Sequence, residues 1–237
     1  MDYFRNVVLV AAIAGVLAGL GMTVAQQLTT VPHILQAEVY EGEGATAAHD
    51  HGDAAARVAA HAHEHGDEGW QPADGFERTA FTLLANIVTG VGFALLLIAA
   101  SELAGGIAGW RQGVFWGLAG FAVFTLAPGL GLPPELPAMP AAELGARQLW
   151  WVATVLSAAG ALALIFYGRT PLAIVAAIAL LVAPHLVGAP EPVSYDTPIP
   201  EGLHHSFVVA VVLTALLFWV LLGALAGLFR GRFIHAS

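Results

Sequence analysis

Long apolar runs alternate with short polar connections along the chain. Six runs of roughly 18–25 residues consist mainly of Ala, Leu, Val, Ile, Phe and Gly, the length a helix needs to cross about 30 Å of hydrocarbon. Because backbone N–H and C=O groups in lipid must be paired within their own segment, these runs predict helices rather than an open sheet. The predicted spans are residues 6–28, 79–102, 112–131, 148–168, 170–188 and 205–229.

The pattern predicts an all-α integral membrane protein, a bundle of about six transmembrane helices with one long polar outer loop. The fifth run is the shortest and ends in "APHLVGAP", so five crossings are the alternative. The first run has a second interpretation as a cleavable signal sequence, with Arg5 before it and the small Ala25 near its end. The expected organisation is a first helix in 1–32, a polar loop in 33–78 and a helical bundle in 79–237.

Composition agrees with a membrane protein and removes several chemistries. The chain is 58% hydrophobic and 11% charged, whereas a soluble domain carries about 25% charged residues. It has no cysteine, so disulfides and thiolate metal sites are excluded. All eight basic residues are arginine, so the lysine of a phosphate-binding loop is missing, and we expect neither nucleotide hydrolysis nor Schiff-base chemistry.

Charge predicts the orientation. With the N-terminus inside, five arginines fall on the inner side and three on the outer side, where Arg57 lies deep in the long loop. The positive-inside rule then places both termini in the cytoplasm, across a bacterial inner membrane. All acidic residues except Asp2 and Glu102, and all histidines except His235, then face the outer compartment. The inner arginines are Arg5, Arg111, Arg169, Arg230 and Arg232.

The outer loop is rich in histidine and acidic residues. Neutral imidazole and carboxylate suit divalent cations such as Co²⁺, Ni²⁺ and Zn²⁺, and a flexible loop can wrap several of these groups around one ion. Nearby carboxylates raise histidine pKa values, so protons compete with metal as the pH falls. The alternative is a solvated acidic linker whose histidines are incidental. The candidate metal ligands are His49, His51, His61, His63, His65, Asp50, Glu64 and Asp67.

Polar residues inside or beside the spans are few, and such residues often mark ion pathways. If the bundle closes, several would meet near the outer surface as an entrance lined by oxygen and nitrogen. The alternative is hydrogen bonding between helices and anchoring at the interface. The candidate pathway residues are Gln26, Gln27, His33, Asn86, His185, His204 and His205.

Two further patterns concern packing and positioning. A proline-rich connection between the third and fourth runs predicts a stiff outer loop that positions other groups or docks a partner, although a plain connector has the same composition. Its candidate residues are Pro133, Pro134, Glu135, Pro137 and Arg147.

Four pairs of glycines spaced by four residues permit close helix approach: Gly15/Gly19, Gly105/Gly109, Gly113/Gly117 and Gly223/Gly227. Tryptophans near span ends, such as Trp110, Trp150 and Trp151, fit interfacial anchors.

Several of these segments together resemble one family. They are "LAPGLGLPPELPAMPAAELGARQLWW", "QAEVYE", the His-rich loop and "GWQPADGFERTAFTLLANI", and they resemble the CbtA family over nearly the whole chain. The resemblance implies a cobalt transporter subunit, linked to cobalamin synthesis and paired with a small single-span, His-bearing CbtB-like partner. The family is usually described with five spans, one fewer than the six predicted above, and it supplies no ligand set to carry over.

Three classes of function remain open. In the first, the chain is a transport subunit whose loop captures the cation and passes it to the entrance. In the second, it is a non-transporting scaffold or assembly subunit, with the loop as a docking or metal-buffering arm; the lack of a carboxylate deep in any span favours this class. In the third it is an enzyme, which we do not expect, because no paired His motif for hydrolysis and no bis-histidine haem spacing occur. We expect no nucleic-acid partner.

Overall fold

The computed structural model describes residues 2–48 and 72–233. Within these ranges the chain is helical and contains no strand, which confirms the predicted all-α class. The helices are α1 (Asp2–Leu28), α2 (Thr30–Ala48), α3 (Phe76–Glu102), α4 (Trp110–Phe121), the π-helical turn η1 (Ala122–Leu126), α5 (Ala127–Gly129), α6 (Leu144–Tyr167), α7 (Pro171–Val187) and α8 (Glu201–Phe233).

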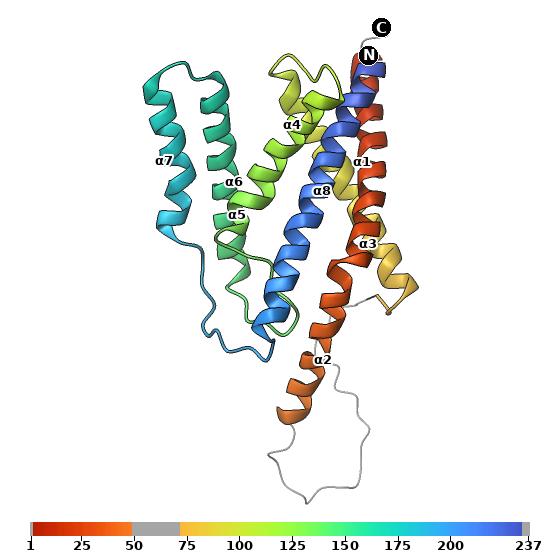
Figure 1. The fold of residues 1–237 in the computed structure, drawn as a ribbon, viewed down its shortest axis with the longest axis vertical. Helices are drawn as coiled ribbons and strands as arrows, with labels where there is room; N and C mark the ends of the chain where they lie inside the picture. Colours follow the sequence, from red (N-terminus) through yellow and green to blue (C-terminus); the bar gives the residue numbers. More distant parts are fainter. Residues whose placement is uncertain (1, 49–71, 234–237) are drawn as a thin grey trace, which may run out of the picture.

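Each predicted apolar run corresponds to helix. The third run is continuous from Trp110 to Gly129 through α4, η1 and α5. By length and composition, α1, α3, α6 and α8 can each cross a membrane. The 17 residues of α7 span about 25 Å, which is shorter than a full crossing. Helix α7 lies alongside α6, and the start of α1 and the end of α8 lie at the same end of the molecule (Figure 1).

Helix α2 is the main departure from the predicted layout. Residues from 33 onward were expected to form a polar loop without a core, but the chain is helical again from Thr30 to Ala48. Pro32 separates α2 from α1, because its ring cannot fit against the carbonyl of Leu28 in a continuous helix. Ala37 of α2 is fully buried against Leu136 and Phe207. The helix therefore extends beyond α1 at the end opposite the termini (Figure 1).

Glycines bring two helix pairs into backbone contact. A Cβ atom at Gly15 of α1 would collide with the backbone of Val91, and one at Gly113 of α4 would collide with the carbonyl oxygen of Gly223 in α8. Three of the four glycine pairs noted in the sequence therefore lie at helix interfaces. In contrast, Gly105 has open space around its Cβ position and a φ of +90°, which serves a turn.

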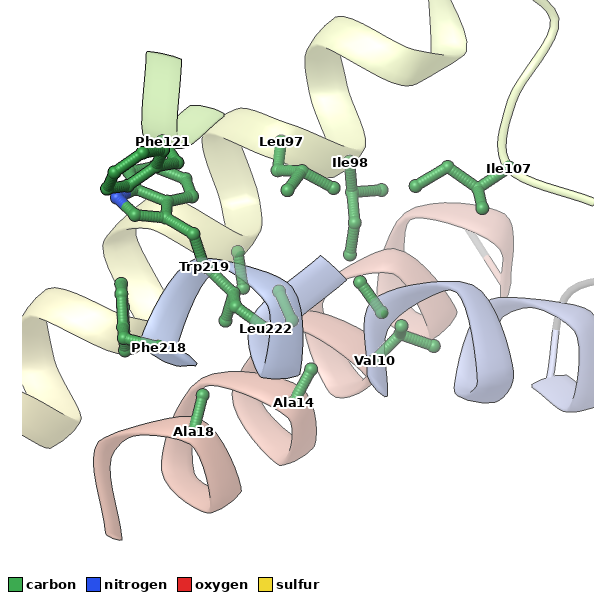
Figure 2. Packing of buried hydrophobic residues seen from close by; sticks show 13 residues of the cluster. Val10, Ala14, Ala18, Leu97, Ile98, Ile107, Phe121, Phe218, Trp219 and Leu222 are labelled. Carbon is green, nitrogen blue, oxygen red and sulfur yellow. The ribbon is translucent and has the colours of Figure 1, made fainter. Parts of the chain in front are cut away.

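The interior is one apolar core shared by α1, α3, α4 and α8. Its buried side chains form one continuous cluster. Figure 2 shows Ala14 and Ala18 of α1 on the side of their helix that faces α8, where Leu222 lies. Toward the outer half, Phe124 stacks on Trp219 with ring centroids 5.5 Å apart. The indole Nε1 of Trp219 donates to Thr125 Oγ1 at 3.1 Å, so its polar atom is satisfied within the apolar interior.

Helices α6 and α7 form a hairpin that packs on the bundle through η1 and α5. Val155 and Ala158 of α6 are buried against Val123 of η1. Trp150 differs from the predicted interfacial anchor. Its ring is 7% exposed, and its Nε1 donates to the carbonyl of Pro184 in α7 at 3.2 Å. This tryptophan therefore joins the two helices of the hairpin.

Candidate functional site

A polar network joins α1 to α3 in the half of the bundle from which α2 emerges. The Asn86 amide donates to Thr23 Oγ1 at 3.0 Å and to Gln26 Oε1 at 2.6 Å. Asn86 can reach both because Gly19 of α1 sits directly against the backbone of α3 at this level. One turn further out, Gln27 Nε2 donates to Thr79 Oγ1 at 3.4 Å. The structure therefore brings three of the predicted pathway residues, Gln26, Gln27 and Asn86, to one helix interface.

His33 lies just beyond this network, at the start of α2. Its Nδ1 is 2.7 Å from the carbonyl oxygen of Thr29. Because a carbonyl oxygen only accepts, Nδ1 carries the proton and the lone pair is on Nε2. The same Thr29 places its hydroxyl 2.9 Å from Thr214 Oγ1 of α8. The end of α1 that adjoins α2 is thus tied to α8 as well as to α3.

His204 is placed in the same way at the start of α8. Its Nε2 lies 3.1 Å from the carbonyl oxygen of Pro134, so Nε2 donates and Nδ1 holds the lone pair. A histidine oriented by a carbonyl through one nitrogen is the arrangement usual for metal-binding imidazoles. His205, the next residue, is exposed. His185 lies elsewhere, with its ring 5.8 Å from that of Trp150.

The proline-rich connection forms part of an outer cap with α2. Glu135 pairs with Arg147 of α6 at 3.0 Å. Ala138, which has a φ of +63°, donates its N–H to Glu41 of α2 at 3.1 Å and accepts from Thr197 at 3.3 Å. These contacts hold the loop against three other segments. The loop is thus held in place, whereas the positioning role of Pro133, Pro134, Glu135, Pro137 and Arg147 stays a prediction.

A groove of about 600 Å³ opens between this connection and the start of α6. Its walls are mostly apolar, with Arg147 and Gln148 as the polar contributions. The lining residues are Leu132, Pro133, Pro134, Leu144, Arg147, Gln148, Trp151 and Val152.

A second ion pair fixes α2 to α3. Arg78 lies 2.8 Å from Glu38 of α2 and 3.1 Å from Asp74. Both side chains of the interhelical pair are about one-third exposed, so the pair contributes little to stability. The continuation of α2 leads toward the His-rich segment.

All eight predicted metal ligands, from His49 to Asp67, lie outside the described residues. Within 2–48 and 72–233, no three His, Asp or Glu side chains are grouped closely enough to hold a metal ion. The described part of the chain offers amide and hydroxyl oxygens and single imidazoles toward the end of the bundle where α2 emerges.

At the other end, the structure contains an ion pair that sequence reasoning did not predict. Arg230 of α8 forms two hydrogen bonds with Glu102 at the end of α3, 2.6 and 3.0 Å long. Only a weak signal in the sequence could have indicated this pair. Both residues lie at the end of an apolar run on the predicted inner side, where Asp2 is the one other acidic residue in the sequence.

Glu143 caps α6 and provides a pH-dependent contribution to stability. Its carboxylate accepts from the N–H groups of Gly145 and Ala146 at 2.7 and 2.6 Å, and these bonds lower its pKa below the usual 4.5. A depressed folded pKa means that the stabilisation is complete above about pH 4.5 and is lost as the pH falls through the folded pKa. The Glu143→Gln variant should therefore melt earlier than the wild type at pH 7, and the difference should shrink at acid pH.

The measurement is thermal unfolding in detergent at several pH values, with Glu191→Gln, a change in an exposed loop, as the control. Equal melting of the two variants at pH 7 would contradict a capping role for Glu143.

The apolar helices and the core that they share define a polytopic helical membrane protein. The chain belongs to the CbtA family, whose model is described as a probable cobalt transporter subunit and matches residues 4–231. It is accordingly a multi-pass membrane protein and a subunit of a probable metal transporter. No curated protein and no solved structure shows significant similarity to it.

Proposed function

We propose that the chain is the membrane subunit of a divalent-metal uptake system with Co²⁺ as its substrate, and with Ni²⁺ and Zn²⁺ as weaker alternatives. The histidines and acids of residues 49–67 capture the cation and pass it to an entrance at the outer ends of α1, α3 and α8. The observation that carries this proposal is the polar network of Gln26 and Asn86, flanked by His33 and His204, at the end of the bundle where α2 emerges.

The chemistry of these groups fits transfer rather than storage. Carboxylates and imidazoles in residues 49–67 raise the local cation concentration. The amide and hydroxyl oxygens around Asn86 are neutral, so they can replace water on a cation without trapping it. His33 and His204 each keep one ring nitrogen with a lone pair, while a carbonyl orients the other. A weak series of donors of this kind favours passage.

We further propose that the chain lies in the bacterial inner membrane, with the His-rich segment outside and both termini in the cytoplasm. Its description as a subunit implies an assembly, and we infer a small single-span, His-bearing CbtB-like protein as the partner. The stiff loop containing Pro133, Pro134 and Pro137, held by the Glu135–Arg147 pair, would position this partner beside the entrance. Energy for uptake would come from an ion gradient or another subunit, since the chain lacks the lysine of a phosphate-binding loop.

A second candidate function has its own support. The hydrophobic cluster from Val10 and Ala14 to Leu222 and Ala226 forms the main core. The buried polar residues in the described part of the chain include no carboxylate and no imidazole; they are Thr23, Thr30, Ser101, Thr154, Thr214 and Arg230. A core without such ligands fits a scaffold or assembly subunit, with the outer segment as a docking or metal-buffering arm. The two functions differ in whether metal crosses the membrane.

Uptake of radiolabelled cobalt into vesicles containing the purified protein tests the proposal. In the test variant, His49, His51, His61, His63 and His65 are changed to Ala. In the matched control, Ala47, Ala48, Ala54, Ala55 and Ala56 are changed to Ser, so that the same segment carries five substitutions and keeps its imidazoles. We expect the His variant to need several-fold more cobalt for half-maximal uptake and to approach the wild-type rate at saturation, because the pathway itself is intact.

The other outcomes are equally informative. Cobalt bound by the wild type without entry into vesicles would contradict transport by this chain alone and support the scaffold function. Equal uptake by the His variant and the Ser control at low cobalt would contradict the capture role while leaving transport in place.

A further inference from the structure

A buried arginine closes the end of the bundle that carries both chain termini (Figure 1). Arg230 is 5% exposed. Its Nε and Nη2 donate to the two carboxylate oxygens of Glu102, at 2.6 and 3.0 Å. Its Nη1 donates to the carbonyl oxygen of Ile107 at 2.8 Å. The planar guanidinium therefore uses its fork on a carboxylate and its remaining edge on the backbone, an arrangement that lysine could not reproduce.

The connection between α3 and α4 is shaped around this guanidinium. Gly106 has a φ of +80°, and a Cβ atom there would collide with the Arg230 side chain. The N–H of Gly106 donates to Ser101 O at 2.8 Å, which folds the connection back over the end of α3. Ile107 then enters the core, fully buried, and Figure 2 shows its side chain beside Ile98 at the edge of the cluster.

The helices that meet at this end include those that form the polar entrance at the other. Glu102 belongs to α3 and Arg230 to α8, while Asn6 of α1 donates to the carbonyl oxygen of Phe233 in α8 at 3.0 Å. Between the two ends lies the apolar core, in which Ala14, Ala94 and Ala226 are fully buried. An ion received at the outer end could therefore leave only after the ends of these helices separate.

We propose that Glu102, Gly106, Ile107 and Arg230 form the inner gate of the protein. In the closed state seen here, the Arg230 guanidinium holds α8 to α3, and the Ile107 side chain fills the adjoining end of the core. In the open state the hydrogen bonds from Arg230 to Glu102 and to the Ile107 carbonyl are broken, and the α3–α4 connection moves away together with the Ile107 side chain. The inference rests on the proposed transport function, because it gives the closed end a role in release.

The absence of cysteine from the natural chain allows a direct test. A single thiol introduced by Ala226→Cys lies one helical turn before Arg230, at a position with no solvent exposure. A second reporter, Ala161→Cys, is equally buried in α6, away from the gate. The rate at which each thiol reacts with a polar maleimide is measured in detergent, with the gate intact and with Glu102→Gln. Asp74→Asn, which removes an exposed partner of Arg78 at the opposite end, is the matched control.

We expect Glu102→Gln to speed labelling at position 226 several-fold and to leave position 161 protected. The Asp74→Asn change should affect neither. Unchanged labelling at position 226 would overturn the gate. Faster labelling at both positions would also overturn it, because the ion pair would then be a general stabilising contact whose loss loosens the whole bundle.

The final arm links the gate to transport. In reconstituted protein with its native Glu102, cobalt should speed labelling at position 226 several-fold, and magnesium at the same concentration should not. Cobalt uptake without this effect would overturn the gate while leaving the proposed function intact. If no cobalt enters the vesicles, the transport proposal fails, whereas the response of position 226 to Glu102→Gln still decides whether the pair keeps this end closed.

Discussion

Replacing Gly113 with leucine is expected to separate α4 from α8 and to reduce sharply the yield of folded protein. A Cβ atom at position 113 would collide with the carbonyl oxygen of Gly223, and a Cβ at 223 would collide with that of Gly113. Both obstacles are backbone, so no rotamer change can relieve them. Overpacking of a close interface commonly costs about 1–3 kcal/mol, and a whole side chain between two touching backbones should lie at or above that range.

The natural control is Gly92→Leu. Gly92 belongs to α3, and a Cβ atom there would meet nothing within 4 Å. The same substitution is then made in an equally apolar helix without a collision. Thermal unfolding in detergent and size-exclusion profiles should show a large loss for Gly113→Leu and little change for Gly92→Leu. Similar melting of the two variants would mean that the α4–α8 contact does not hold the bundle together.

Removing the Arg230 side chain is expected to be the second most damaging single change. The Arg230→Ala variant leaves the Glu102 carboxylate, which is 26% exposed, without its guanidinium partner, and the carbonyl of Ile107 loses its donor. Breaking a fully buried ion pair on one side costs about 3–5 kcal/mol. The cost here should be lower, because Glu102 is partly exposed and water solvates part of its charge. The variant should nevertheless melt below the wild type.

Two further variants test whether the loss of stability comes from the broken ion pair. Arg232→Ala removes an exposed arginine two residues further along the same helix and should have little effect on melting. A double variant, Glu102→Gln with Arg230→Met, removes both charges of the pair and should recover part of the lost stability, since no carboxylate is then held at this place without the Arg230 guanidinium. If Arg230→Ala and Arg232→Ala melt alike, the ion pair does not contribute to the fold.

The positions of the helices could be predicted from the sequence because they depend on local properties. An apolar run in lipid has to satisfy its backbone internally, so its length alone indicates a helix. Pro128 lies in α5, after the π-helical turn η1 and near the end of the third run. Helix α2 was missed because its sequence carries many polar residues. Its burial depends on Leu136 and Phe207, which lie far away in the chain.

The candidate site likewise has residues that could be predicted from the sequence and contacts that could not. Asn86, Gln26 and His33 could be singled out because polar residues are rare near apolar spans. Which of them share an interface could not be predicted, since Asn86 meets Gln26 through the close approach of Gly19 to α3. His185 was grouped with His204 on the basis of hydropathy alone. In the structure the ring of His185 lies against Trp150, and His204 binds Pro134.

By itself the sequence determined that this is a helical membrane protein and where its apolar helices lie. These features follow from composition and from the need of each backbone N–H and C=O group in lipid to be paired within its own segment. Both depend on residues that are close together in the chain. The tertiary structure alone decided that α2 docks on the bundle, that the polar residues of α1 and α3 form one network, and that Arg230 meets Glu102 across 128 positions. Such contacts depend on how closely distant helices approach, and that distance is set by all of their packed side chains together.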